Sequence, residues 1–260
     1  TVSAVILVIA ALASILPGGM ILAVVLYAVS LVGFLELTKA CGVREGQKPN
    51  ALEIAGIAAI TCYYLMTYFV PDASYAVMVI LLAMIAMMSV YVFGFPKYHA
   101  NQVMNAYFAL IYAPVMLSFV FLTRQLEDGI YLVWMIFISS WISDTCAYLV
   151  GVMVGKHKLA PVLSPKKSVE GAIGGTVGAA LLGFLYGSFF MSDKAGACAL
   201  ICAVGAVLSQ IGDLTASAIK RNHDIKDYGH LIPGHGGILD RFDSVIFTAP
   251  VIFVMALLSM

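Results

Sequence analysis

Four aspartates stand inside or beside apolar stretches of the sequence, where a carboxylate is rare. They are Asp144, Asp213, Asp240 and Asp243. A charged side chain costs about 3 kcal/mol at the centre of a membrane-inserted helix, so an ionisable residue there indicates a functional site. These four residues are therefore the first candidates for chemistry.

Helical spacing groups these carboxylates with other polar side chains. At about 100° per residue, the positions Gln210, Asp213, Ser217 and Lys220 fall within an arc of about 80° on one helix. Asp240 and Asp243 are three residues apart and so share a helix face. One helix thus presents one carboxylate and another presents two.

Carboxylates that converge repel one another and require cations. Their oxygen atoms suit Mg²⁺ or a similar hard ion. The neighbouring loops are basic and contain Lys166, Lys167, Lys220, Arg221, Lys226 and Arg241. This mixture suits a metal-bound polyphosphate, with carboxylates on the metal and Lys or Arg on phosphate oxygens. The glycines Gly234, Gly236 and Gly237 flank His235 just before an apolar segment, and such a turn offers backbone N–H groups to an anion.

The composition indicates an integral membrane protein. Of 260 residues, 62% are hydrophobic and 11% are charged, whereas soluble domains contain about 25% charged residues. This balance excludes both a soluble domain and a disordered chain. The net charge is zero, so no global basic field indicates nucleic acid as a partner. Nine hydrophobic segments are predicted, at residues 2–16, 19–37, 52–70, 74–94, 103–122, 129–150, 171–190, 195–216 and 237–259.

The distribution of basic residues predicts the orientation of these segments. The loops after the first, third, fifth and seventh segments contain only Arg124 and Lys194. The other loops, with the start of the ninth segment, contain Lys39, Arg44, Lys48, Lys97, Lys156, Lys158, Lys166, Lys167, Lys220, Arg221, Lys226 and Arg241. Because positive loops stay in the cytoplasm, we expect an all-α polytopic protein with about nine transmembrane helices, N-terminus inside and C-terminus outside. The loops 151–170 and 218–236 then face the cytoplasm.

Each feature also has a purely structural interpretation. Asp144 could be a buried carboxylate bonded to nearby hydroxyl groups, and Asp213 with Gln210 could join two helices. Asp240 and Asp243 could complement a helix dipole. Lys156 and Lys158 could be determinants of topology alone. The pairs Gly171/Gly175 and Gly183/Gly187 predict close helix packing.

Residues 217–243 read SAIKRNHDIKDYGHLIPGHGGILDRFD, and this run resembles the signature of the bacterial-type CDP-diacylglycerol synthases, or phosphatidate cytidylyltransferases. The segments 155–161 (GKHKLAP), 164–171 (SPKKSVEG), 144–151 (DTCAYLVG) and 210–213 (QIGD) are also similar to that family. Where this chain has Ser168 the family commonly has Thr, so the hydroxyl is kept. The resemblance by motif covers about residues 140–250.

The resemblance implies an enzyme that makes CDP-diacylglycerol and pyrophosphate from CTP and phosphatidate in phospholipid biosynthesis. It implies Mg²⁺ and a second ion such as K⁺, a homodimer, and the cell inner (cytoplasmic) membrane with the active site facing the cytoplasm. We expect residues 1–130 to form about five N-terminal transmembrane helices. We expect residues 131–260 to form about four catalytic ones.

The resemblance, joined to the spacing above, also predicts residue roles. The expected metal ligands are Asp144, Asp213, Asp240 and Asp243. The expected catalytic residues are Asp213, Asp240, Asp243, Lys167 and Arg241. The expected substrate contacts are Ser164, Lys166, Lys167, Ser168, Ser217, Lys220, Arg221, Lys226, Asp227, His235, Gly236 and Gly237.

Two other classes of protein remain as alternatives. A cation channel or transporter could use Asp144 and Asp213 as pathway residues, and it would show ion flux without CTP. A CTP-dependent lipid kinase of the polyprenol or phytol type could share the general layout, and it would release CDP.

Overall fold

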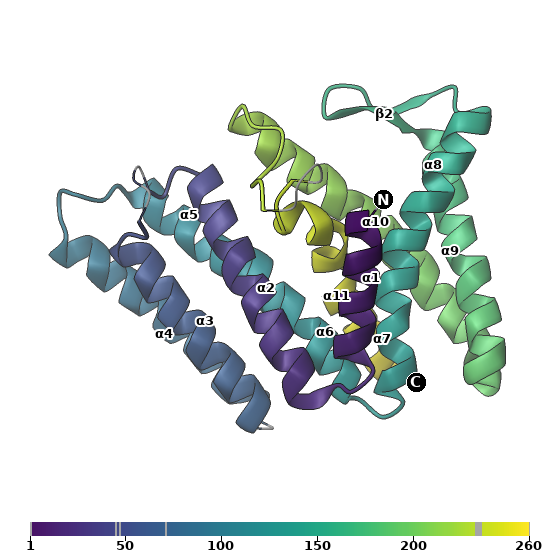
Figure 1. The fold of residues 1–260 in the computed structure, drawn as a ribbon, viewed down its shortest axis with the longest axis horizontal. Helices are drawn as coiled ribbons and strands as arrows, with labels where there is room; N and C mark the ends of the chain where they lie inside the picture. Colours follow the sequence, from purple (N-terminus) through teal and green to yellow (C-terminus); the bar gives the residue numbers. More distant parts are fainter. Residues whose placement is uncertain (1, 45, 47, 71, 232–235, 260) are drawn as a thin grey trace. The chain divides into compact units, whose positions relative to one another are not determined.

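The chain folds almost entirely into helices (Figure 1). The structure is a computed structural model that describes residues 2–44, 46, 48–70, 72–231 and 236–259, with only the backbone of residues 2–7. The helices are α1 (Val2–Ile15), α2 (Gly19–Ala40), α3 (Ala51–Phe69), α4 (Ala73–Phe93), α5 (Ala100–Leu110), α6 (Met116–Gln125), α7 (Gly129–Phe137), α8 (Ser143–Val154), α9 (Val169–Phe190), α10 (Ala195–Asn222) and α11 (Leu239–Ser259).

Eight helical stretches within the described residues are long and apolar enough to cross a membrane. The stretches 100–125 and 129–154 each join two α-helices, and 192–222 adds the short 3₁₀ turn η3 (Ser192–Lys194) to α10. The first segment, α1, has 14 residues, fewer than the roughly 20 that a span needs. The prediction of a polytopic membrane protein with about nine helical segments is confirmed.

Two of the long stretches contain a π-helical turn. The turn η1 (Ile111–Val115) joins α5 to α6 and contains Pro114, which lacks a backbone donor. The turn η2 (Ile138–Ile142) joins α7 to α8 and ends two residues before Asp144. Such turns are frequent at functional sites, and this one begins the helix that carries a candidate carboxylate.

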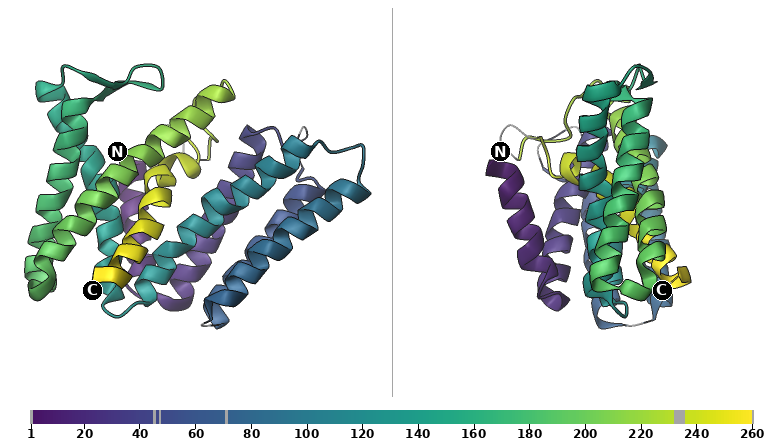
Figure 2. Two further views of the ribbon diagram at one scale, coloured as in Figure 1. Left: turned by 180° about the vertical axis from the view of Figure 1, so that it is seen from behind. Right: turned by 90° about the vertical axis from the view of Figure 1, so that its right-hand side faces the viewer.

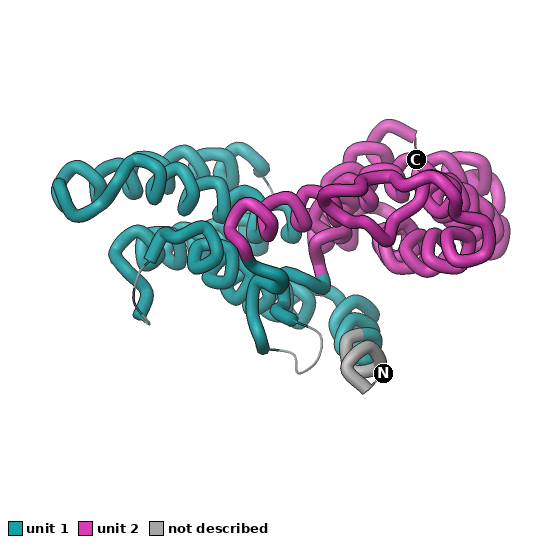
Figure 3. The backbone as a smooth tube through the Cα atoms, turned by 90° about the horizontal axis from the view of Figure 1, so that it is seen from above, with its two compact units in different colours: residues 1–118, 225–241 teal, residues 119–224, 242–260 magenta. Residues whose placement is uncertain are grey.

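The helices group into two compact units, drawn in two colours in Figure 3. Unit 1 comprises residues 1–118 and 225–241, and unit 2 comprises residues 119–224 and 242–260. The chain passes from one unit to the other within α11. The expectation that residues 1–130 form N-terminal transmembrane helices and residues 131–260 form the catalytic ones stays a prediction.

In unit 1, α3 packs against both α2 and α4 (Figure 1). The loop from α2 to α3 is fixed by Glu53, whose side chain has no exposed surface. Its carboxylate accepts hydrogen bonds from Thr38 Oγ1 at 2.6 Å and from Asn50 N at 3.0 Å, and it pairs with Arg44 Nε at 3.5 Å. Asn50 Oδ1 in turn accepts from Glu53 N at 3.0 Å, which completes a capping box and begins α3.

Glu36 on α2 holds the start of α11. Its Oε1 accepts a hydrogen bond from Ile238 N at 3.1 Å, and its Oε2 accepts one from Leu239 N at 2.9 Å. The first N–H groups of a helix have no partner within the helix, and a carboxylate also complements the helix dipole. A Cβ on Gly237 would lie 2.5 Å from the Glu36 oxygens, so the approach requires glycine there.

In unit 2, α9 packs against both α8 and α10 (Figure 2). The buried face of α9 consists of small residues at every fourth position: Gly171, Gly175, Ala179, Gly183 and Gly187. A Cβ on Gly175 would lie 2.8 Å from the Ser143 carbonyl oxygen of α8, and one on Gly187 would lie 2.9 Å from Ala195 Cα of α10. The prediction of close packing through these glycines is confirmed.

The all-helical expectation omitted one hairpin. The strands β1 (Lys158–Ala160) and β2 (Ser164–Ser168) pair antiparallel in the loop between α8 and α9. The carboxylate of Glu170 anchors the entry to this hairpin, because it accepts from Lys156 N at 3.1 Å and from His157 N at 3.2 Å. At the other end of unit 2, Lys194 Nζ lies 3.9 Å from Asp128 Oδ2. These two residues belong to the loops after the fifth and seventh predicted segments. The charge pattern places both loops on the same side of the membrane, and their contact agrees with that prediction.

We expect Glu36→Gln to destabilise the start of α11. An amide offers one acceptor oxygen where the carboxylate offers two, so one of the N–H groups of Ile238 and Leu239 loses its partner, at about 1–3 kcal/mol. Hydrogen exchange of the peptide spanning residues 236–243 should become faster, and the thermal midpoint in detergent should fall. The control is Glu127→Gln, at an exposed position. Equal exchange in both variants would contradict the capping role.

Candidate active site

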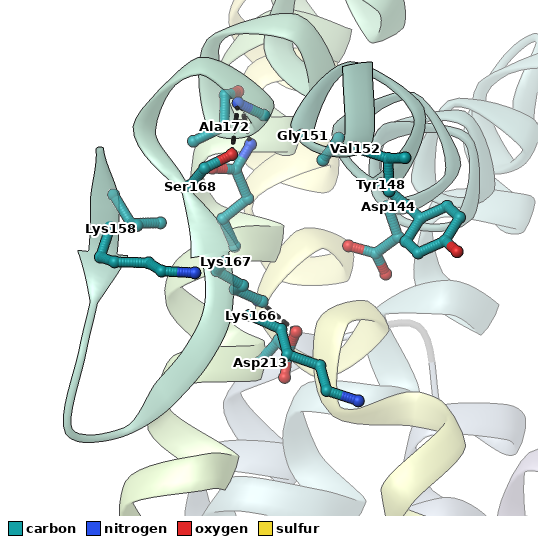
Figure 4. A pocket seen from close by; sticks show the side chains of 14 residues that line it. Asp144, Tyr148, Gly151, Val152, Lys158, Lys166, Lys167, Ser168, Ala172 and Asp213 are labelled. Atoms are coloured by element: carbon teal, nitrogen blue, oxygen red, sulfur yellow. Dashed lines mark hydrogen bonds and ion pairs between the residues drawn. The ribbon is translucent and has the colours of Figure 1, made fainter. Parts of the chain in front are cut away.

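A cavity of about 590 Å³ opens in unit 2 among α8, the β2 strand, α9 and α10 (Figure 4). Asp144 and Tyr148 face it from α8, Lys166 and Lys167 from β2, and Asp213 from α10. The close approach of α8 and α10 to the glycine face of α9 is what allows these side chains to meet. Three regions that are separate in the sequence thus contribute to one cavity.

Three of the predicted carboxylates interact within unit 2. Asp213 repels both Asp144 and Asp243, and these two repel each other. Ser244 Oγ lies 3.4 Å from both Asp144 Oδ2 and Asp243 Oδ1, and its backbone N donates to Asp243 Oδ1 at 2.8 Å. A hydroxyl has only one proton to donate, so Ser244 serves one of the two carboxylates at a time.

Two lysines partly offset this negative charge. Lys167 Nζ forms an ion pair with Asp213 Oδ2, and the two side chains are 25% and 28% exposed. Lys167 also attracts Asp144, and Lys220 of α10 attracts Asp243. Because the carboxylates outnumber these ammonium groups, the cluster favours an additional cation. The Lys167 side chain is partly exposed, but its Nζ atom is buried beside Asp213, so an anion reaches that charge only by taking the place of the carboxylate.

The other predicted residues of unit 2 fall into two groups. Lys166 and Ser168 line the cavity, and Ser168 Oγ also caps α9 by accepting from Gly171 N at 3.1 Å. Ser164 on β2, and Ser217 and Arg221 on α10, are not among its lining residues.

The remaining predicted residues belong to unit 1, in the segment 225–241. They are Lys226, Asp227, Gly236, Gly237, Asp240 and Arg241. His235 lies outside the described residues. Asp240 and Asp243 both stand in the first part of α11, three residues apart as expected.

The Asp240 carboxylate organises this segment. Its Oδ2 accepts hydrogen bonds from Tyr228 N and from Gly237 N, both at 2.9 Å. Gly236 has a φ of +83°, and a Cβ there would lie 2.8 Å from Asp240 Oδ2. Glycine is therefore required both by its backbone conformation and by the nearness of the carboxylate.

Sequence reasoning missed some of these contacts. Glu36 was not among the predicted residues, although a lone carboxylate inside the second apolar segment was a usable signal. Lys158, interpreted as a determinant of topology, lines the cavity together with Tyr148. Gln210 supports the structural alternative, because its Nε2 donates to the Ala172 carbonyl at 3.0 Å and so joins α10 to α9.

Comparison with known proteins covers nearly the whole chain. The family model described as the cytidylyltransferase family matches residues 1–259. A phosphatidate cytidylyltransferase of Staphylococcus aureus (strain COL) is 33% identical over 265 residues, which cover 100% of this chain and 98% of that protein. A phosphatidate cytidylyltransferase of Staphylococcus saprophyticus is 33% identical over 261 residues, covering 98% and 97%. These matches extend over both units, and the chain belongs to the cytidylyltransferase family.

Proposed function

We propose that this chain is a membrane-bound phosphatidate cytidylyltransferase, which joins CTP and phosphatidate to give CDP-diacylglycerol and pyrophosphate. The observation that supports this most directly is the cavity of unit 2, where Asp144, Asp213 and Lys167 meet. The names of the Staphylococcus relatives state the same activity. Carboxylates beside cationic side chains suit a reaction between two phosphate groups.

The reaction depends more on neutralising the negative charge of the two phosphate groups than on a general base. A phosphate oxygen of phosphatidate attacks the α-phosphorus of CTP, a new P–O bond forms, and the bond to the bridging oxygen breaks as pyrophosphate leaves with the electron pair. A phosphate monoester has a second pKa of about 6, so the nucleophile is already largely dianionic at neutral pH. The barrier lies in bringing two anions together in line.

The basic side chains are the groups that bring the anions together. We assign Lys167 and Lys220 to the phosphates, since both already interact with the carboxylate cluster. An incoming phosphate would take over the contact that Lys167 makes with Asp213. Lys166 and Ser168 supply further contacts from the same cavity. From the signature we also propose Arg241 as a catalytic residue and the following as substrate contacts: Ser164, Ser217, Arg221, Lys226, Asp227, His235, Gly236 and Gly237.

The carboxylates fit Mg²⁺ by the type of their donor atoms. Among the described residues, no three His, Cys, Asp or Glu side chains stand close enough to hold a metal ion. Mg²⁺ usually takes one or two carboxylates together with substrate phosphates, so a complete protein cage is not required. We assign Mg²⁺ to one or two of the carboxylates Asp144, Asp213 and Asp243 of unit 2, with a second ion such as K⁺ nearby, and the signature gives Asp240 of unit 1 the role of a metal ligand as well. Bound there, Mg²⁺ would offset phosphate charge.

The proposal includes the setting of the enzyme. The chain is a multi-pass membrane protein, and we place it in the cytoplasmic membrane with the basic loops and the active site facing the cytoplasm. CTP then enters from water and phosphatidate from the bilayer. We also propose a homodimer, which chemical cross-linking in native membranes tests.

The decisive experiment measures pyrophosphate release by the purified full chain in detergent. The mixture contains CTP, phosphatidate and Mg²⁺, and each is omitted in turn. Release that needs all three supports the proposal. Release of CDP in the presence of a lipid alcohol would instead identify a kinase. Ion flux in liposomes without CTP turnover would favour the channel or transporter.

We expect Asp240→Asn and Asp243→Asn each to abolish turnover while the protein still folds. An amide has lost the negative charge that attracts a cation, so kcat should fall at least about a hundredfold, as for lost charge stabilisation worth several kcal/mol. The measurement is the pyrophosphate assay at saturating Mg²⁺, with monodispersity checked by size exclusion. Asp193→Asn, on the exposed turn η3, is the control. Near-normal activity in either test variant would remove that residue from the proposed site.

We expect Lys167→Ala to reduce kcat/KM much more than Lys156→Ala. Losing a charged contact to phosphate costs about tenfold to a hundredfold in rate, whereas Lys156 is exposed and does not line the cavity. Steady-state kinetics with varied CTP measure both variants. Equal losses would show that the two lysines do not divide into phosphate-binding and topological roles.

A further inference from the structure

A second cavity, of about 270 Å³, lies in unit 1 between the loop from α2 to α3 and the loop from α4 to α5. Both loops stand at the same end of unit 1 (Figure 1). Among the residues that the structure describes, none lines both this cavity and the cavity of unit 2. The reaction proposed above makes no use of it.

Basic and amide side chains line this second cavity. They are Arg44, Lys48, Asn50, Lys97, His99 and Gln102. Among its described lining residues none is acidic. Arg44 already pairs with the buried Glu53, so the charge available to a ligand comes mainly from Lys48 and Lys97, both of which are exposed. With Arg44, Lys48 and Lys97 set against Glu53 and against Glu45, which adjoins Arg44 in the sequence and lies outside the described residues, the charge balance is still positive and favours an anion.

Part of the wall of the cavity is packed into the buried core of unit 1. Val43 and Tyr98 line it and also belong to the buried cluster with Leu52, Met87, Val103 and Ala106. The Val43 carbonyl accepts hydrogen bonds from Asn50 Nδ2 at 2.8 Å and from Gln102 Nε2 at 3.0 Å. The first bond closes the loop from α2 to α3 on itself, and the second joins that loop to α5 before any ligand arrives, which lowers the entropy cost of binding.

Two helices begin at this cavity. Asn50 is the residue before α3 and His99 the residue before α5, and both line it. The N-terminal end of a helix carries partial positive charge that attracts phosphate. Glu53 offsets part of this charge at α3, and α5 has no acidic residue in its first turn. The helix field thus adds to the field of Lys48 and Lys97.

Exposed apolar side chains adjoin the basic ones. Phe93 and Phe95, at the end of the span α4, are 90% and 71% exposed, and Lys97 follows two residues later with its Nζ 5.5 Å from the centre of the Tyr98 ring. Phe93 ends an apolar span, so its exposed ring stands where acyl chains of the surrounding lipid can contact it. A ligand that combines a phosphate with acyl chains matches both parts of this surface, and a soluble anion matches only one.

We propose that this cavity binds the headgroup phosphate of an anionic phospholipid that is not a substrate. Basic pockets between transmembrane helices bind such headgroups in other membrane proteins. Lys48 and Lys97 contact the phosphate, and the acyl chains extend along the exposed face beside Phe93. The lipid therefore bridges the two loops that hold α3 and α5.

The test measures lipid binding to the purified full chain by native mass spectrometry. The protein in detergent is titrated with phosphatidylglycerol, with phosphatidylcholine, or with phosphatidylglycerol plus inorganic phosphate. The variant is Lys48→Gln with Lys97→Gln. The matched control is Lys39→Gln with Lys156→Gln, which removes the same charge at exposed positions outside the cavity.

We expect the wild type to prefer phosphatidylglycerol to phosphatidylcholine. The cavity variant should bind phosphatidylglycerol about tenfold or more weakly, while the control stays within about twofold. Equal binding by the two variants would overturn the proposal and leave these lysines as determinants of topology. Displacement of the lipid by an equal concentration of inorganic phosphate would also overturn it, because the cavity would then take a soluble anion. The readout does not depend on turnover, so it is separate from the test of the enzymatic activity.

Discussion

The need to provide partners for carboxylates among apolar helices governs this structure. Glu53 and Glu36 are the structural cases, because hydroxyl and backbone N–H groups, and for Glu53 an arginine, approach their oxygens directly. Asp144, Asp213 and Asp243 differ, because they repel one another and share few donors. Carboxylates that repel one another and have few hydrogen-bond donors attract cations. The need for partners thus stabilises unit 1, where donors are present, and makes the carboxylate cluster of unit 2 a candidate site for chemistry.

Small residues on α9 make the cluster possible. Side chains larger than glycine at Gly175 or Gly187 would meet the backbone of α8 or α10, and the three helices would separate. Helix association in lipid depends on such close packing, since the surrounding chains are as apolar as the helices. The glycine face of α9 thus affects the site indirectly, because it determines how close Asp144 on α8 lies to Asp213 on α10.

The sequence predicted what depends on local pattern. Apolar runs predicted most helix ends to within about four residues, although α10 extends six residues beyond the predicted 216, to Asn222. The i, i+3 spacing placed Asp240 and Asp243 on one helix. It did not predict the β1–β2 hairpin, whose short strands carry no alternation of apolar residues, or the capping of α11 by Glu36, about 200 residues earlier in the chain. Both depend on contacts between distant segments. Lys158 shows the same limit, because only the hairpin brings it to the cavity.

The depth of the carboxylates along their own helices suits the two substrates of the proposed reaction. A rise of about 1.5 Å per residue places Asp144 about 15 Å from the end of α8 and Asp213 about 14 Å from the end of α10. Asp243 lies about 6 Å from the start of α11. Each is therefore within reach of a basic loop, yet inside a stretch apolar enough to span the membrane. Carboxylates about one to three turns inside the helix ends can meet both a nucleotide that enters past the basic loops and the phosphate of a lipid beside an apolar span.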